Sequence, residues 1–427
     1  KLVIFIVRYI INFTSNLQES NQRIILIIPL IIFFLILIFV EFYFFQGIKK
    51  ILNKRTRLIY ICSFSLLYVF FIIYSFTFEI SSSSKIFSYY LTLIFLLLIS
   101  KIITFPIILT EDLIRLFNFL MSKSKRYKKV NLKRRALISK LTLILASLPL
   151  PIGFDGVLFG RYRYRIINHE IYFKNLPEKF DGYKLTQISD FHCGSLENRD
   201  MVEKAIRMIN SEKSDLILFT GDFVNNKYDE IKPWVETFSK LKAKDDMISV
   251  LGNHDYGDYQ RWSSKQEKEE NFKKLLEIQK KIGFKVLMNE HKYIFKNDQK
   301  IAIIGVENWG ARFNKLGDIE KSIKNISDTD FKIVLSHDPT HWERILKDHP
   351  KQFDLTLSGH THGMQFGIEI PGFIKWSPVQ WVYKYWAGLY NHQEKYLNVN
   401  RGFGVLAYPG RVGIWPEITT ITLKRSV

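Results

Sequence analysis

The chain has 427 residues and a formal net charge of +20, and its basic excess is unevenly distributed. The first 154 residues hold 20 of the 61 Lys and Arg but only 5 of the 41 Asp and Glu, so they carry +15 and the remainder only +5. A folded domain that binds nucleic acid carries its basic excess as a patch facing the phosphates, whereas here the basic residues flank long apolar runs. This pattern argues against a nucleic-acid partner, and the length allows two or three domains.

Long apolar runs dominate the chain before residue 155. They are Ile24–Phe45, Leu58–Phe78, Ile86–Leu109 and the shorter, weaker Leu137–Gly153. Because about 20 apolar residues cross a bilayer as a helix, we predict an all-α transmembrane module of about four helices over residues 1–155. A buried core helix could explain one such run, but three close together would need a very large core. The short segment Lys1–Phe13, interrupted by Arg8, fits an interfacial helix better than a span.

Basic residues in short loops predict the orientation, because Lys and Arg collect on the cytoplasmic side of a membrane. Five of them lie between residues 49 and 57, and a dense basic stretch runs from Lys123 to Arg135. We expect both loops inside, which places the following domain on the outer face if the fourth run crosses. If that run does not cross, the domain is cytoplasmic.

After residue 155 the apolar residues form short strand-like runs, and five of these are followed within two residues by Asp, Asn or His. The runs are Lys184–Ser189, Leu216–Thr220, Met247–Leu251, Lys332–Ser336 and Leu355–Ser358. In α/β sheets the carboxyl ends of the strands converge on one crevice. Carboxylate, amide and imidazole groups suit divalent ions such as manganese, iron and zinc. The pattern therefore predicts one metal site built by five loops.

The motifs at these strand ends occur in a characteristic order. They are Asp190-Phe191-His192, Gly221-Asp222, Gly252-Asn253-His254-Asp255, His337 and Gly359-His360-Thr361-His362. A lone His or Asp is more often structural, but the full ordered set resembles the calcineurin-like metallophosphoesterase family, specifically its membrane-anchored bacterial phosphodiesterase branch. The resemblance covers roughly residues 176–423. It implies an α/β fold, a sandwich of two mixed β-sheets flanked by helices, over a catalytic domain of residues 156–427.

The resemblance also assigns metal ligands. Asp190, His192 and His362 would hold a first divalent ion, Asn253, His337 and His360 a second, and Asp222 would bridge the two ions. A bridging carboxylate can hold two ions roughly 3.5 to 4 Å apart, so that they share a hydroxide nucleophile and clamp both oxygens of an in-line displacement at phosphorus. Manganese, iron and zinc all fit these ligands.

Two residues beside the ligands are predicted to be catalytic. By the resemblance, His254 stabilises the transition state or protonates the leaving group. Asp255 could orient its imidazole, although capping of a loop or helix explains this residue equally well. The protein phosphatase branch carries a carboxylate partner for the histidine that corresponds to His254, and Asn225 stands at that position here. The sequence therefore leaves open which group adjusts the proton affinity of His254.

Together these features predict a metal-dependent hydrolase of phosphoester or pyrophosphate bonds. We expect a multi-pass protein of the bacterial cytoplasmic (inner) membrane, with its catalytic domain on the periplasmic or outer face. Its partners would be the lipid bilayer and a phosphate-containing small-molecule or lipid-linked substrate, without an obligate protein partner. One alternative is a UDP-diacylglucosamine-type pyrophosphatase of lipid A synthesis, whose cytoplasmic substrate conflicts with an outward domain. Another is a non-catalytic metal-binding scaffold or sensor, against which the complete ligand set argues.

Three further features have two explanations each. Aromatic residues crowd positions 376–390, which fits either a membrane interface or the packing of a long loop. Arg411 could bind a second phosphate, although a solvent-facing turn residue is the simpler interpretation. Glu41 and Lys101 are expected either to lie near helix ends or to extend their charged groups along the helix to the membrane interface.

Overall fold

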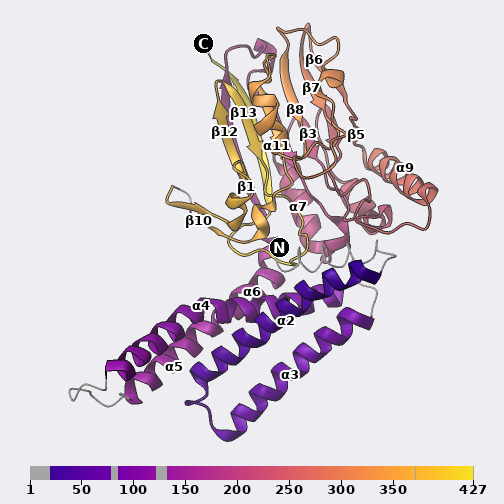
Figure 1. Cartoon of the computed structure of the whole chain (residues 1–427). Helices are drawn as coiled ribbons and strands as arrows, with labels where there is room; N and C mark the ends of the chain where they lie inside the picture. Colours follow the sequence, from indigo (N-terminus) through magenta and orange to yellow (C-terminus); the bar gives the residue numbers. More distant parts are fainter. Residues whose placement is uncertain (1–19, 78–84, 122–131, 371, 427) are drawn as a thin grey trace. The chain divides into compact units, whose positions relative to one another are not determined.

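The computed structural model describes residues 20–77, 85–121, 132–370 and 372–426 (Figure 1). The chain forms two compact units, Lys1–Asp155 and Gly156–Val427, which we describe separately. The predicted interfacial helix Lys1–Phe13, and most of the loops before Lys85 and before Leu132, lie outside the described residues.

The first unit is helical. Its helices are α2 (Ser20–Ile48), α3 (Lys54–Thr77), α4 (Lys85–Met121) and α5 (Leu132–Ser147), and α6 (Pro149–Leu158) leads into the second unit. Within the described ranges, two segments are long and apolar enough to cross a membrane, Ile86–Met121 and Lys133–Tyr162. Large apolar side chains such as Leu35, Leu66 and Phe117 are exposed on this unit. Lipid accommodates such a surface, whereas water does not; the number of four spans stays a prediction.

An ion pair inside the helical unit corrects one expectation. Glu41 of α2 pairs with Lys101 of α4, and the hydroxyls of Tyr60 and Tyr68 on α3 also donate to the Glu41 carboxylate. Lys101 is buried. These two charges therefore pair with each other between helices and do not extend to the interface. A buried charge is costly unless it has a partner, and the ion pair provides one for each residue.

The second unit is built on two six-stranded sheets. The first has the order β1-β14-β2-β3-β4-β5, and the second has the order β12-β13-β9-β8-β7-β6. The strands of the first sheet are β1 (Arg165–Phe173), β2 (Lys184–Ile188), β3 (Leu216–Thr220), β4 (Asp246–Val250), β5 (Lys285–Val286) and β14 (Glu417–Arg425). Those of the second are β6 (Glu290–Lys296), β7 (Gln299–Gly305), β8 (Phe331–Leu335), β9 (Leu355–Ser358), β12 (Gly388–His392) and β13 (Lys395–Val399). Parallel and antiparallel pairs occur in both sheets, so both are mixed.

The sheets pack face to face because their central strands are apolar on both sides. In β3, Leu216 and Leu218 belong to the core between the sheets, whereas Ile217 and Phe219 pack under helices. Strands covered on both faces read as continuous apolar runs. The predicted sandwich of two mixed sheets flanked by helices is confirmed.

Helices cover the outer faces of the two sheets. They are α7 (Arg199–Ser211), α8 (Val235–Phe238), α9 (Lys265–Ile282), α10 (Ile319–Ser322) and α11 (Thr340–Arg344). α9 begins where the Ser264 side chain accepts a hydrogen bond from the Glu267 backbone, and it ends at Gly283 in the left-handed region.

A separate hairpin projects from the second unit (Figure 1). Its strands are β10 (Ile368–Ile370) and β11 (Ile374–Trp376), which pair with each other and with neither six-stranded sheet.

Candidate metal centre

The predicted ligands come from loops at the carboxyl ends of five strands. β2 leads into Asp190 and His192, and β3 leads into Asp222; the remaining loops, after β4, β8 and β9, carry Asn253, His337, His360 and His362. β2, β3 and β4 are neighbours in one sheet, and β8 and β9 are neighbours in the other. Because the two sheets face each other, their parallel strand ends bring these loops together.

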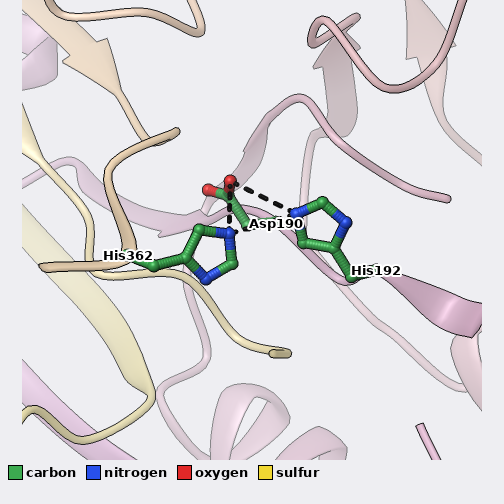
Figure 2. Close-up of side chains that lie close together, drawn as sticks. All are labelled: Asp190, His192 and His362. Carbon is green, nitrogen blue, oxygen red and sulfur yellow. Dashed lines mark hydrogen bonds and ion pairs between the residues drawn. The ribbon is translucent and has the colours of Figure 1, made fainter. Parts of the chain in front are cut away.

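The first group of candidate ligands consists of Asp190, His192 and His362, all buried. Figure 2 shows the three side chains directed toward one another. Nε2 of His362 lies 3.1 Å from Oδ1 of Asp190 and 3.1 Å from Nε2 of His192. Three donor atoms from two sheets thus surround one point.

The second group consists of Asp222, His337 and His360. Nε2 of His337 lies 3.2 Å from Oδ2 of Asp222 and 3.1 Å from Nδ1 of His360. The same Oδ2 lies 3.5 Å from Nε2 of His192, which belongs to the first group. Asp222 therefore stands between the two groups.

Asn253 stands between Gly252 and His254, and the backbone of both of these neighbours lies close to Asp222. The side-chain amide nitrogen of Asn253 donates to the Tyr259 hydroxyl at 2.8 Å, which fixes the orientation of the side chain. Its Oδ1 is buried and makes no hydrogen bond within the described part of the chain. A buried, unmatched oxygen is costly, and a cation at this point would remove that cost. The residues present therefore fit a metal centre.

Hydrogen bonds outside the centre fix the tautomers of two ligand imidazoles. His192 Nδ1 donates to Oδ1 of Asn225 at 3.0 Å, and His337 Nδ1 donates to the Thr220 carbonyl at 2.7 Å. In both rings the Nε2 lone pair is then directed into the centre. Metal-binding histidines are usually held by such outer contacts.

The backbone at the centre is strained. Asp190, His192, Asp222, His360 and His362 all have φ between 46° and 70°, in the left-handed region that β-carbons disfavour. Such residues cluster at functional sites, where the surrounding structure enforces the conformation. Gly252 is required by close approach, since a Cβ there would lie 2.6 Å from the backbone nitrogen of Asp222.

The electrostatics of the centre follow from burial and from the closeness of carboxylates to imidazoles. Burial alone would raise the pKa of Asp222, but the imidazoles of His337 and His254 hold it well below the usual value. Burial lowers the pKa of His337, yet the Asp222 carboxylate raises it to about 10. Protons and metal ions would compete for these same atoms, so metal binding would release protons.

The His254 ring is positioned by backbone. Its Nδ1 donates to the Asn225 carbonyl at 2.7 Å, while its own amide donates to Oδ1 of Asp222 at 2.9 Å. The ring stands edge-on to His192 with a centroid distance of 5.0 Å. A main-chain carbonyl therefore takes the place of the expected carboxylate partner.

Asp255 has a different set of contacts. Its buried carboxylate accepts hydrogen bonds from the backbone amides of Asp222, Phe223, Val224 and Gly252. These contacts join the loops that follow β3 and β4. They support the loop-capping interpretation of Asp255.

Both parts of this architecture match known protein families. Residues 183–364 match the family model "calcineurin-like phosphoesterase", and residues 22–161 match "probable calcineurin-like phosphoesterase, transmembrane domain". The uncharacterized metallophosphoesterase YkuE of Bacillus subtilis is 32% identical over 302 residues, which cover 69% of this chain and 98% of YkuE. The chain belongs to the calcineurin-like metallophosphoesterase family.

Other relatives combine the same parts. The transmembrane protein with metallophosphoesterase domain of Danio rerio is 25% identical over 297 residues, which are 67% of this chain and 62% of that protein. Among solved structures, the phosphopantetheinyl hydrolase of Mycobacterium tuberculosis has a TM-score of 0.30 and 11% identity over 51% of this chain and 89% of that one. Family membership makes this metallophosphoesterase a phosphoester hydrolase that uses divalent metals, and the transmembrane match associates it with a membrane.

The sequence did not predict three side-chain contacts to the candidate ligands. The hydroxyl of Tyr383 lies 2.8 Å from Nε2 of His360, and Oδ2 of Asp338 lies 3.6 Å from the same atom. The side chain of Asn225 orients His192. None of these three residues belongs to a ligand motif, although Asp338 directly follows His337 and Tyr383 lies in the aromatic stretch that the sequence singled out.

Arg411 corrects the simpler expectation for that residue. Its guanidinium is fully buried and donates to the carbonyls of Arg401, Gly402 and Gly404. It lies 3.3 Å from Nδ1 of His362. Arg411 therefore supports the loop behind the first ligand group and is not a solvent-facing turn residue. Its burial is stabilised because the three buried carbonyls require hydrogen-bond donors, which the guanidinium supplies.

Proposed function

We propose that this metallophosphoesterase uses a two-metal centre to hydrolyse phosphodiester or pyrophosphate bonds in membrane-proximal, lipid-linked substrates. The observation that carries the two-metal part is the place of Asp222, whose Oδ2 lies 3.5 Å from His192 and 3.2 Å from His337. A carboxylate between two ligand groups is what a bridged metal pair requires.

The candidate ligands would be shared between the two ions as the sequence predicts. Asp190, His192 and His362 would hold one ion, Asn253, His337 and His360 would hold the other, and Asp222 would be shared. When bound, two divalent ions supply Lewis acidity to phosphoryl oxygens and make water acidic enough to act as a nucleophile near neutral pH. Manganese, iron and zinc remain the candidates.

His254 would transfer the proton. Because Nδ1 donates to the Asn225 carbonyl, Nε2 is the basic atom of this tautomer. The ring is beside His192 and mostly buried, so a phosphate held by the centre would meet it at close range. Once Nε2 has taken up a proton from solvent, the His254 imidazolium can protonate the departing oxygen or donate a hydrogen bond to the transition state.

A cavity of about 620 Å³ next to His360 supports the choice of substrate. Tyr383 and Asp338, which contact His360, form part of its wall. The cations Arg312, Arg344 and Lys384 also line it, together with Trp381. Cations beside a reacting phosphate suit a second anionic group, and an indole suits an amphiphile.

The location is also part of the proposal. The basic residues between residues 49 and 57 and before α5 favour cytoplasmic loops, and a membrane crossing after them puts the hydrolase domain on the outer face of a bacterial inner membrane. There the enzyme would meet exported lipids.

The test uses the full chain in nanodiscs, with manganese and bis-p-nitrophenyl phosphate first and then a lipid-linked diphosphate. We expect metal-dependent hydrolysis, with two metal ions per chain measured by elemental analysis, and loss of activity in Asp222→Asn. Hydrolysis by a chain that binds a single ion would refute the two-metal mechanism. Equal rates on soluble and lipid-linked substrates would refute the membrane-proximal specificity.

A further inference from the structure

The hairpin formed by β10 and β11 has an unusual distribution of polarity. Ile368 lies opposite Trp376, Ile370 lies opposite Ile374, and between these pairs Glu369 lies opposite Lys375. Opposite residues of an antiparallel pair share a face, and successive residues alternate. One face is therefore wholly apolar and the other carries both charges.

The charged face is the one that anchors the hairpin to the domain. Glu369 forms an ion pair with the buried Arg401, which also pairs with Glu417 at the start of β14. Lys375 donates to the Ala387 carbonyl and lies 5.0 Å from the Trp386 ring. These contacts direct the charged groups of Glu369 and Lys375 toward the domain, although Lys375 itself stays partly exposed, and the apolar side chains lie on the opposite face of the hairpin.

The apolar face is exposed. Ile368, Ile370 and Ile374 are exposed, and Phe373 at the tip has 85% of its surface accessible. Trp381 is 74% accessible and meets Trp376 edge-on, with 6.1 Å between ring centroids. A contiguous apolar surface of this kind marks a contact with another apolar phase.

The apolar face continues to the hydrolase site. Trp381 also lines the cavity that Tyr383 and Asp338 share. At the base of the hairpin, Ser377 donates to the Gly363 carbonyl at 2.7 Å, directly after His362. The hairpin is thus fixed to the loop that carries two metal ligands.

We infer that this hairpin face, from Ile368 to Trp381, docks on the lipid bilayer and inserts Phe373 into its interfacial region. The same chain carries a transmembrane domain, so a bilayer is always within reach at a high effective concentration. Trp and Phe are the residues that membrane interfaces favour. Insertion is limited to the interface, because the outer edges of a two-stranded hairpin carry backbone groups that need water. Docking would present the cavity rim to lipid phosphates.

A lipid-quenching experiment tests this inference without any catalytic readout. Cys62 is exposed and Cys193 is buried, so the full chain with Cys62→Ser offers no competing surface thiol among its two cysteines. In this background Phe373→Cys is labelled with an environment-sensitive fluorophore. Phe295→Cys on β6 is the matched control, because Phe295 is also an exposed aromatic residue of the same domain, 67% accessible. Both proteins go into nanodiscs with and without phosphatidylcholine spin-labelled at carbon 5.

We expect spin-labelled lipid to quench the probe at position 373 at least twofold and to leave the probe at 295 within about 10% of its original intensity. Melting curves matching the unlabelled parent show that both labelled proteins are folded. Equal, weak quenching at both positions would overturn the inference. A probe at 373 that is shielded from aqueous iodide but not quenched by spin-labelled lipid would also overturn it, because a second copy or the chain's own helices would then cover the hairpin.

Discussion

His254 donates a hydrogen bond from Nδ1 to the backbone carbonyl of Asn225, at 2.7 Å. A carbonyl cannot take up a proton near neutral pH, so this contact fixes the tautomer without sharing the charge. Since the partner belongs to the main chain, substitution of the Asn225 side chain leaves it in place. The roles of these two residues can therefore be separated by mutation.

His254→Ala should reduce kcat by roughly 10²- to 10⁴-fold, the usual contribution of a positioned general acid. The metal content should not change, because His254 belongs to neither ligand group. Steady-state kinetics together with elemental analysis of the purified chain would measure both. Loss of a metal ion in this variant would instead make His254 a ligand.

Asn225→Ala should weaken metal binding by roughly 10- to 100-fold, because it removes the acceptor that orients His192. At saturating metal, kcat should stay close to that of the parent. Titration of the apoprotein with manganese measures the change, and Asn225→Asp, which keeps an acceptor oxygen, should retain most of the affinity. A fall in kcat at saturating metal would show that the side chain acts on His254 as well.

Asp255→Ala should destabilise the hydrolase domain by about 2 to 4 kcal/mol, because four buried backbone amides lose their acceptor. A thermal melt of the full chain would detect this. Asp229→Ala is the control, because Asp229 forms an exposed i,i+3 pair with Lys232 and should change stability by roughly 0.5 kcal/mol or less. Equal melting temperatures for the two variants would contradict the capping role.

Glu41→Leu should destabilise the helical unit, because it leaves the buried Lys101 without its partner. Breaking a buried pair costs roughly 3 to 5 kcal/mol, whereas replacing both members by apolar residues can be neutral. The double variant Glu41→Leu/Lys101→Leu should therefore recover most of the thermal stability in detergent. Failure to recover would assign the remaining loss to the Tyr60 and Tyr68 hydroxyls, which donate to the same carboxylate.

Ile370→Asp combined with Phe373→Asp should leave hydrolysis of a soluble diester unchanged, because both side chains are exposed and lie outside the metal centre. Hydrolysis of a lipid-linked substrate in vesicles should fall, since two charges at the hairpin tip oppose insertion. The ratio of the two rates is the measurement. An unchanged ratio would separate substrate choice from the hairpin.

The sequence by itself determined the five strands that precede the ligand motifs and the order of the predicted ligands. The ends of these strands were predicted to within one residue. This was possible because a strand buried on both faces has an uninterrupted run of apolar residues, as in Leu216–Thr220. The ligand motifs follow these strands directly, so the convergence of Asp190, Asp222 and His337 followed from the topology of parallel strands.

Only the tertiary structure decided which atoms complete the centre. Tyr383 reaches His360, and Arg411 reaches the loop behind His362, from parts of the chain without a ligand motif. Asn225 offers its side chain to one histidine and its carbonyl to another, a division that residue types cannot reveal. The outward apolar face of the hairpin likewise depends on where Glu369 and Lys375 find partners. A local pattern fixes periodicity and strand ends, whereas hydrogen bonds between distant segments depend on how the whole domain packs.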